Sequence, residues 1–146
     1  AIVLAALGPR MLELAGRLAD GTITWMVGPE TLSGHTVPII RDAADGRIPS
    51  VVTCLPACVT NDAATARKLA SSRYSLYGEL PSYRAMLDRE GVGDPADIAL
   101  IGSEDTVEAG IRRMYEAGAT AVGLEVFGSS EEQSATWGLV RSLTTD

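Results

Sequence analysis

The sequence predicts an α/β fold in which four parallel strands alternate with helices. One observation is that a strand running into Gly-Pro and then into a helix occurs twice. A second is that apolar stretches of strand length alternate along the chain with stretches of helical periodicity. This order implies parallel strands with right-handed crossovers, either as an open sheet or as an arc of a barrel.

The first strand is predicted over residues 2–7, a continuous apolar run that suits a strand buried on both faces of a parallel sheet. Gly8 ends it, and Pro9 begins a helix at a position where a missing amide N–H costs nothing. Asp20 and Gly21 are expected to close that helix with a left-handed cap.

The second repeat has a strand over residues 22–27, followed by Gly28-Pro29 and a helix to residue 44. Gly34 and Pro38 should bend or interrupt this helix, and Asp45-Gly46 should end it. At both junctions free amide N–H groups face a positive helix end, where many α/β proteins bind phosphate.

The third strand is predicted over residues 50–60, with Pro56 marking a bulge or an early end. A long helical excursion over residues 61–91 follows, and such insertions are often lids or oligomer surfaces. Residues 94–102 are interpreted as a short connecting piece. An amphipathic helix then begins after Ser103.

The fourth strand is predicted over residues 120–127, before a final helix over residues 131–143. A chain of 146 residues suffices for one domain, so residues 1–146 are taken as a single domain. Ala1 opens directly inside an apolar strand without an initiating methionine, which indicates a part of a longer protein.

The charge pattern restricts the class of partner. The formal net charge is -7 and Lys68 is the only lysine, so the basic stripe that binds nucleic acid is missing. No apolar run is long enough to span a bilayer, so no membrane role is expected. Partners are expected to be small molecules or protein.

The cysteine pattern favours the cytoplasm. Cys54 and Cys58 would lie on one face of a strand about 13 Å apart, too far for a disulfide, so both should be reduced and buried. A zinc site would need further ligands, and His35 is the only histidine, so no metal site is expected.

Three stretches of the chain have a specific pattern. They are Ala-Ala-Leu-Gly-Pro-Arg-Met at residues 5–11 with Leu-Ala-Gly at 14–16 and Leu-Ala-Asp-Gly at 18–21, Leu-Pro-Ala-Cys-Val-Thr at 55–60, and Glu-Ala-Gly-Ala-Thr at 116–120. In these stretches the chain resembles the C-terminal half of the bacterial-luciferase-like flavin monooxygenase superfamily, especially its branch of oxidoreductases that use the deazaflavin coenzyme F-420. The resemblance covers nearly the whole chain.

The resemblance implies strands five to eight of a (β/α)8 TIM barrel. A complete barrel needs eight strands and about 250 residues, and only half of that is present. A half-barrel has two open edges and an exposed inner face, so it should form a homodimer, associate with a missing N-terminal half, or rearrange.

The resemblance also implies a cofactor site at the C-terminal ends of the strands, with F-420 as the expected cofactor and FMN as the alternative. In the family the cofactor phosphate is held by backbone groups after barrel strands five and six. Carried over, the cofactor-binding residues are Ala6, Leu7, Gly8, Pro9 and Arg10 in the first loop, and Met26, Val27 and Gly28 in the second. Strand topology alone points to the same two loops.

Three further side chains each have two interpretations. Glu125 could project into a pocket beside the cofactor ring or pair with an arginine. Trp25 could stack on a ligand or belong to the core. His35 lies on a polar helical segment and is expected to be a solvated surface residue.

No catalytic residue can be assigned, because in the family the residues that support hydride transfer come mainly from the first four strands. The second loop also lacks the basic residue that sugar-phosphate-oxidising relatives use, which argues against that substrate class. The leading hypothesis is an oxidoreductase that moves hydride between F-420 or a flavin and a small organic substrate, with this chain inactive alone.

Two alternatives remain open. The first is a non-catalytic half-barrel that dimerises and holds a flavin or assists assembly. The second is a small doubly wound domain that binds a phosphorylated ligand; it is less favoured, because Gly8-Pro9 lacks the Gly-x-Gly-x-x-Gly spacing and no Walker lysine follows.

Overall fold

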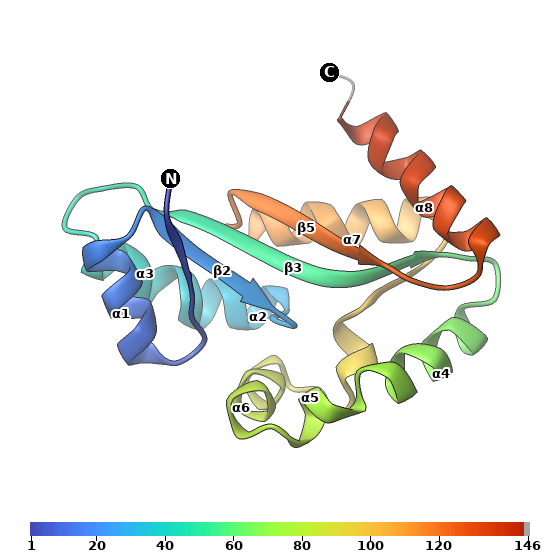
Figure 1. Cartoon of the computed structure of the whole chain (residues 1–146), viewed down its shortest axis with the longest axis horizontal. Helices are drawn as coiled ribbons and strands as arrows, with labels where there is room; N and C mark the ends of the chain where they lie inside the picture. Colours follow the sequence, from blue (N-terminus) through green and yellow to red (C-terminus); the bar gives the residue numbers. More distant parts are fainter. Residues whose placement is uncertain (145–146) are drawn as a thin grey trace.

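A computed structural model describes residues 1–144 of the chain as parallel strands alternating with helices (Figure 1). Its strands are β1 (Val3–Ala5), β2 (Gly21–Trp25), β3 (Ser50–Val59), β4 (Leu100–Gly102) and β5 (Ala121–Val126). Its helices are α1 (Pro9–Leu18), α2 (Pro29–Thr31), α3 (Val37–Ala43), α4 (Ala63–Arg73), α5 (Ser75–Glu79), α6 (Pro81–Glu90), α7 (Glu104–Glu116) and α8 (Ser130–Leu143), with a π-helical turn η1 (Leu32–Thr36) and a 3-10 turn η2 (Pro95–Ile98). The predicted fold class is confirmed.

Every pair of neighbouring strands is parallel, with β3 at the centre of the sheet. The order across the sheet is β1-β2-β3-β5, and the sheet is not closed. Residues 94–102, expected as a mere connection, contain η2 and the short strand β4, which pairs with the last part of β3. The described residues thus form one strand more than the four expected.

Strand β3 continues through Pro56, where a bulge or an early end was expected. Its pairing with β2 ends at Cys54, and its pairing with β4 begins at Ala57. The Cys54 carbonyl and the Thr60 amide both bond on the β2 and β4 side, and Pro56 shares their orientation because strand residues alternate. Its missing N–H therefore faces the gap between two partner strands, where no donor is needed.

The two faces of the sheet differ in burial. On one face Val51 and Leu55 are 1% exposed beneath the helices. On the other face Ile23, Trp25 and Cys54 are only partly buried. One face thus carries the core, and the other remains partly open, as expected for half of a barrel.

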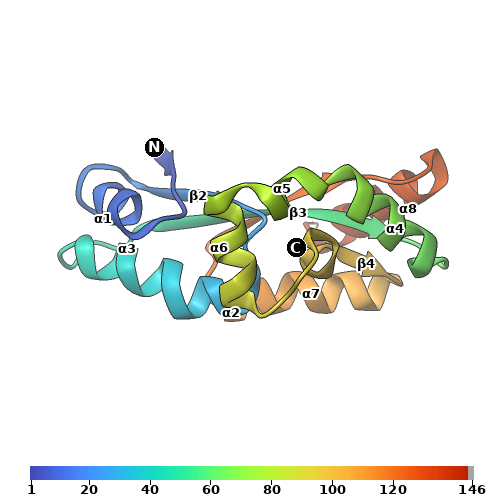
Figure 2. The same ribbon diagram turned by 90° about the horizontal axis from the view of Figure 1, so that it is seen from below.

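Helices α1, α3 and α7 pack on the buried face, and Figure 2 shows α2, α3 and α7 in a row along one side of the sheet. The segment α4–α6 lies below β2 and β3 in Figure 1, and Figure 2 shows that its last helix, α6, runs from α5 to α2. No helix in residues 1–144 combines the length and apolar character needed to cross a membrane.

The helix after the second Gly-Pro pair is interrupted where Gly34 and Pro38 predicted. Residues 32–36 form the π-helical turn η1, between α2 and α3. Pro38 has no N–H to donate to the Gly34 carbonyl, so the α-helical pattern cannot be kept through this turn.

The expected left-handed cap at Asp20-Gly21 is wrong. Helix α1 ends at Leu18, and Gly21 is the first residue of β2. Glycine is required there for space, since a Cβ would overlap the Ser50 carbonyl of the neighbouring strand. Asp45 and Gly46 do take positive φ angles of 49° and 82°, as predicted for the end of α3.

The C-terminus of α1 is capped by a distant side chain. The guanidinium of Arg47 donates to the carbonyls of Gly16, Arg17 and Ala19. These carbonyls have no partner within the helix, and a cation also suits the negative helix end.

Replacing Arg47 by methionine should lower the free energy of unfolding by about 1–2 kcal/mol, since several hydrogen bonds to a charged donor are lost. Urea unfolding measures this change. Arg41→Met is the matched control, because Arg41 is exposed on α3 and makes no ion pair or side-chain hydrogen bond within residues 1–144. Equal unfolding midpoints for the two variants would contradict the capping role.

Candidate functional site

Parallel pairing brings both Gly-Pro junctions to one edge of the sheet. Ala5 of β1 lies opposite Ile23 of β2, so the loops that follow these strands leave the sheet side by side. This is the edge formed by the carboxyl ends of the strands, where α/β proteins bind ligands. The structure therefore groups the predicted site residues of the first loop (residues 6–10) and the second loop (residues 26–28).

The first loop is open to a ligand. Ala6 is buried, Leu7 is partly buried, and Gly8, Pro9 and Arg10 are exposed. Gly8 is the N-cap of α1 in an extended conformation, and no side chain caps the helix. The first amides of α1 thus face solvent at the positive helix end.

Arg10 adds a second feature that suits an anion. Its side chain is exposed in the first turn of α1 and makes no ion pair or hydrogen bond with the part of the chain that the structure describes. A free guanidinium beside free amides is the donor set that binds a phosphate group.

A hollow of about 490 Å³ adjoins the first loop. Its wall comes from the end of β1 and the first loop, from Ile23 and Trp25 of β2, and from Ser82 and Tyr83 of α6. None of the residues that line it is charged. The hollow therefore suits an uncharged, largely apolar group next to a loop with exposed helix amides.

Aromatic side chains hold the α4–α6 segment against the end of β2. Five of the seven aromatic residues of the chain meet there: Trp25, Tyr74, Tyr77, Tyr83 and Phe127. Edge-on contacts join the rings at centroid distances from 4.8 to 6.0 Å, a geometry that is favourable beyond simple burial.

Trp25 belongs to this cluster, which agrees with the core role that was one of its two interpretations. Its centroid lies 6.0 Å from that of Tyr74 and 5.9 Å from that of Tyr77. Trp25 also lines the hollow, and its buried Nε1 has no hydrogen-bond partner among residues 1–144. An unpaired indole N–H is costly, because its hydration is lost without replacement.

Glu125 pairs with an arginine, the second of its two expected roles. Its carboxylate accepts hydrogen bonds from Arg73 at 2.8 Å and from the Tyr74 hydroxyl at 3.0 Å. Burial raises the pKa of Tyr74 well above its usual range, and the Glu125 carboxylate raises it further. This network fastens α4 to β5.

The second loop differs from the first. Met26 and Val27 are fully buried, and Met26 has a positive φ of 57°, which a bulky side chain rarely adopts. The carboxylate of Glu90 accepts from the amides of Glu30 at 3.2 Å and Thr31 at 2.8 Å. The chain's own anion thus occupies this helix start, and cofactor binding by Met26, Val27 and Gly28 stays a prediction.

His35 is not a solvated surface residue, contrary to the expectation. Its side chain is 6% exposed, and its Nε2 lies 2.9 Å from the carbonyl oxygen of Leu7 in the first loop. Neither the role of His35 nor that of Glu90 is predictable from local sequence, since their partners lie 28 and about 60 residues away along the chain. No local pattern marks such contacts.

The cysteines are free thiols, with Cys58 buried and Cys54 partly buried. Burial raises the pKa of Cys58 to about 11, helped by the Glu132 carboxylate, and burial also raises the pKa of Cys54. Both are therefore unreactive at neutral pH. Within residues 1–144, no three His, Cys, Asp or Glu side chains form a group that could hold a metal ion.

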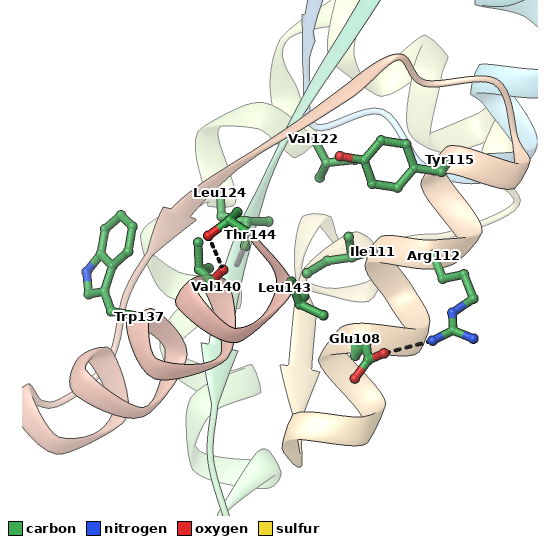
Figure 3. Close-up of a pocket in the computed structure, with 10 residues that line it drawn as sticks. All are labelled: Glu108, Ile111, Arg112, Tyr115, Val122, Leu124, Trp137, Val140, Leu143 and Thr144. Carbon is green, nitrogen blue, oxygen red and sulfur yellow. Dashed lines mark hydrogen bonds and ion pairs between the residues drawn. The ribbon is translucent and has the colours of Figure 1, made fainter. Parts of the chain in front are cut away.

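A second hollow of about 360 Å³ lies between β5, α7 and α8 (Figure 3). Apolar side chains line most of it, including Ile111, Val122 and Leu124. Val122 and Leu124 alternate along β5 with Gly123 and Glu125, so this hollow faces the helix layer rather than the open face. It is separate from the candidate site.

The fold and the site together define the class of protein: part of an α/β barrel, with an open loop and exposed helix amides at the carboxyl edge of its strands. The sequence model of the luciferase-like monooxygenase family matches residues 2–121. The chain therefore belongs to the luciferase-like monooxygenase family. None of the curated proteins that were compared matches the chain.

Solved structures share this fold. An F420-dependent secondary alcohol dehydrogenase in complex with an F420-acetone adduct superposes with a TM-score of 0.73 at 18% identity, over 95% of this chain and 47% of the other. The coenzyme F420-dependent tetrahydromethanopterin reductase from Methanopyrus kandleri gives 0.69 at 24% identity, over 93% and 47%.

A flavoprotein is similar as well. The oxygenating constituent of 3,6-diketocamphane monooxygenase from the CAM plasmid of Pseudomonas putida, a type II Baeyer-Villiger monooxygenase in complex with FMN, gives a TM-score of 0.60 at 18% identity, over 92% of this chain and 43% of the other. The chain thus spans less than half the length of these three structures.

Replacing Glu90 by alanine should lower the free energy of unfolding by about 1–2 kcal/mol, because two amides at the start of α2 lose a charged acceptor. Urea denaturation checks this. Glu79→Ala on the exposed side of α5 is the control, since Glu79 forms no hydrogen bond or ion pair within residues 1–144. A loss no larger than that of the control would contradict the capping role.

Replacing Tyr74 by phenylalanine should flatten the alkaline dependence of stability. In the native chain the pKa of Tyr74 is raised above its unfolded value of about 10, so its contribution is complete below about pH 10 and is lost as the pH rises further. Between about pH 9 and about pH 11, the free energy of unfolding should fall more in the native chain than in Tyr74→Phe. Equal falls in the free energy of unfolding of the two proteins would show that Tyr74 does not contribute to the pH dependence of stability.

Proposed function

We propose that this chain is the C-terminal half of a coenzyme F-420-dependent oxidoreductase that moves hydride between the cofactor and a small organic substrate. The observation that carries the proposal is the open first loop beside an uncharged hollow at the carboxyl edge of the strands. Family membership and two F420-dependent structural neighbours support the choice of cofactor, with FMN as the alternative.

The residues present fit such a group. The amides at the start of α1 and the Arg10 guanidinium are suited to its phosphate. The hollow walled by Trp25 and Tyr83 is suited to its flat aromatic ring system and would keep water away from it. The cofactor supplies the hydride chemistry, while this chain binds and orients it.

We assign no catalytic residue to this chain, and we propose that it is inactive without further strands. The open face of the sheet and the unclosed edges at β1 and β5 support this, since a closed barrel leaves no edge. We propose the cytoplasm as its location, because both cysteines are free thiols.

A second candidate function is a non-catalytic half-barrel that forms a homodimer and holds a flavin without turnover. The unclosed edges favour it equally, because a second copy could pair with them. The coding context separates the two candidates: an upstream reading frame that supplies four more βα units would support the enzyme. Stable dimers without turnover would support the alternative.

Fluorescence titration with F-420, and separately with FMN, tests the proposed cofactor on the chain and on the product of its complete reading frame. Saturable quenching is expected, and Arg10→Ala should weaken binding about tenfold, since a hydrogen bond to a charged group is lost. Arg41→Ala should leave the affinity unchanged, because this part of α3 packs beside Gly16 near the C-terminal end of α1, whereas the first loop precedes the N-terminus of α1. The absence of saturable quenching with both cofactors would count against the proposed function.

A further inference from the structure

We propose that His35 is a positioning residue, which fixes the first loop for anion binding through the carbonyl of Leu7. This inference rests on the proposed function for its ligand, but its structural part stands alone. His35 is the only histidine of the chain, and its Nε2 lies 2.9 Å from the Leu7 oxygen. The contact joins the helix after β2 to the loop after β1.

The π-helical turn η1 aims the His35 side chain at this loop. A π-helical turn holds one residue more than an α-helical turn, so it changes the direction of the side chains within it, and such turns are frequent at functional sites. His35 is the fourth of the five residues of η1 and is buried.

The helix that carries His35 is held from both ends. On one side the Thr31 hydroxyl donates to the Met86 carbonyl at 3.0 Å, and Glu90 accepts from the Thr31 amide. On the other side α3 packs closely against α1. The imidazole therefore reaches Leu7 from a rigid support rather than from a mobile loop.

Peptide geometry connects the Leu7 carbonyl to the ligand side of the loop. The peptide between Leu7 and Gly8 is planar and trans, so its C=O and N–H point in opposite directions. Because the Leu7 oxygen faces His35, the Gly8 N–H points away from η1. Leu7 and Gly8 both line the hollow, and Gly8 is exposed.

Few other hydrogen bonds hold this segment. The Ala6 amide donates to the Ile23 carbonyl at a long 3.4 Å, and Gly8 caps α1 without a side-chain hydrogen bond. Without the imidazole, the Leu7–Gly8 peptide could turn, and the amides would no longer be preorganised for an anion.

The experiment compares two amide side chains of different reach at position 35. The Gln side chain places its amide nitrogen close to where Nε2 lies, whereas Asn is too short for that position. His35→Gln should keep the Gly8 amide resonance at its position in the native chain. His35→Asn should shift that resonance.

Thr36→Val is the matched control in the same turn. The buried Thr36 hydroxyl has no hydrogen-bond partner among residues 1–144, so its removal should leave the Gly8 amide unchanged. Circular dichroism checks that all three variants fold. If His35→Asn does not fold, the test is whether the Gly8 amide resonance of His35→Gln matches that of the native chain.

The second readout is the F-420 dissociation constant. His35→Asn should weaken binding about fivefold, the scale of one hydrogen bond, while Gln and Thr36→Val stay within twofold of the native chain. If the native chain binds neither F-420 nor FMN, the proposed function fails, but the Gly8 measurement still decides the role of His35. The inference is overturned if the Gly8 amide resonance is unchanged in His35→Asn or shifted in His35→Gln.

Discussion

The parallel pairing of β1 with β2, and of β2 with β3, is the constraint on which the rest of the structure depends. It places the carboxyl ends of these strands at one edge, and with them both Gly-Pro junctions. An antiparallel pair would have sent the two junctions to opposite ends of the sheet. Everything that makes this edge a candidate site, including the free amides of α1 and the adjoining hollow, follows from that pairing.

The two Gly-Pro junctions share a local sequence but differ in the groups that contact them. At the second, the carboxylate of Glu90 satisfies the amides of Glu30 and Thr31. At the first, the amides of α1 are uncapped and Arg10 is exposed. Helix starts are attractive to any anion, so a carboxylate of the chain and an external phosphate compete for the same kind of position. The α4–α6 segment, which delivers Glu90, thereby makes the two junctions unequal.

The same segment shapes the open face of the sheet. Its tyrosines pack edge-on around Trp25, and the Glu125 pair with Arg73 ties its first helix to β5. The face it covers is only partly buried, whereas the opposite face carries a dense core. That asymmetry suits a chain that spans less than half the length of its structural neighbours, because half of a barrel lacks the strands opposite its inner face, and here only the α4–α6 segment packs against part of that face.

Local sequence determined the alternation of strands and helices, the start of each helix at Gly8-Pro9 and Gly28-Pro29, and the interruption near Pro38, because periodicity, proline and glycine act over a few residues. Local sequence also predicted a candidate ligand-binding site at the first loop. Only the tertiary structure decided that Pro56 lies within β3, that His35 contacts Leu7, and that Glu90 fills the second junction. Each of these depends on groups far apart in the chain, and their meeting is set by the packing of whole elements rather than by any neighbouring residue.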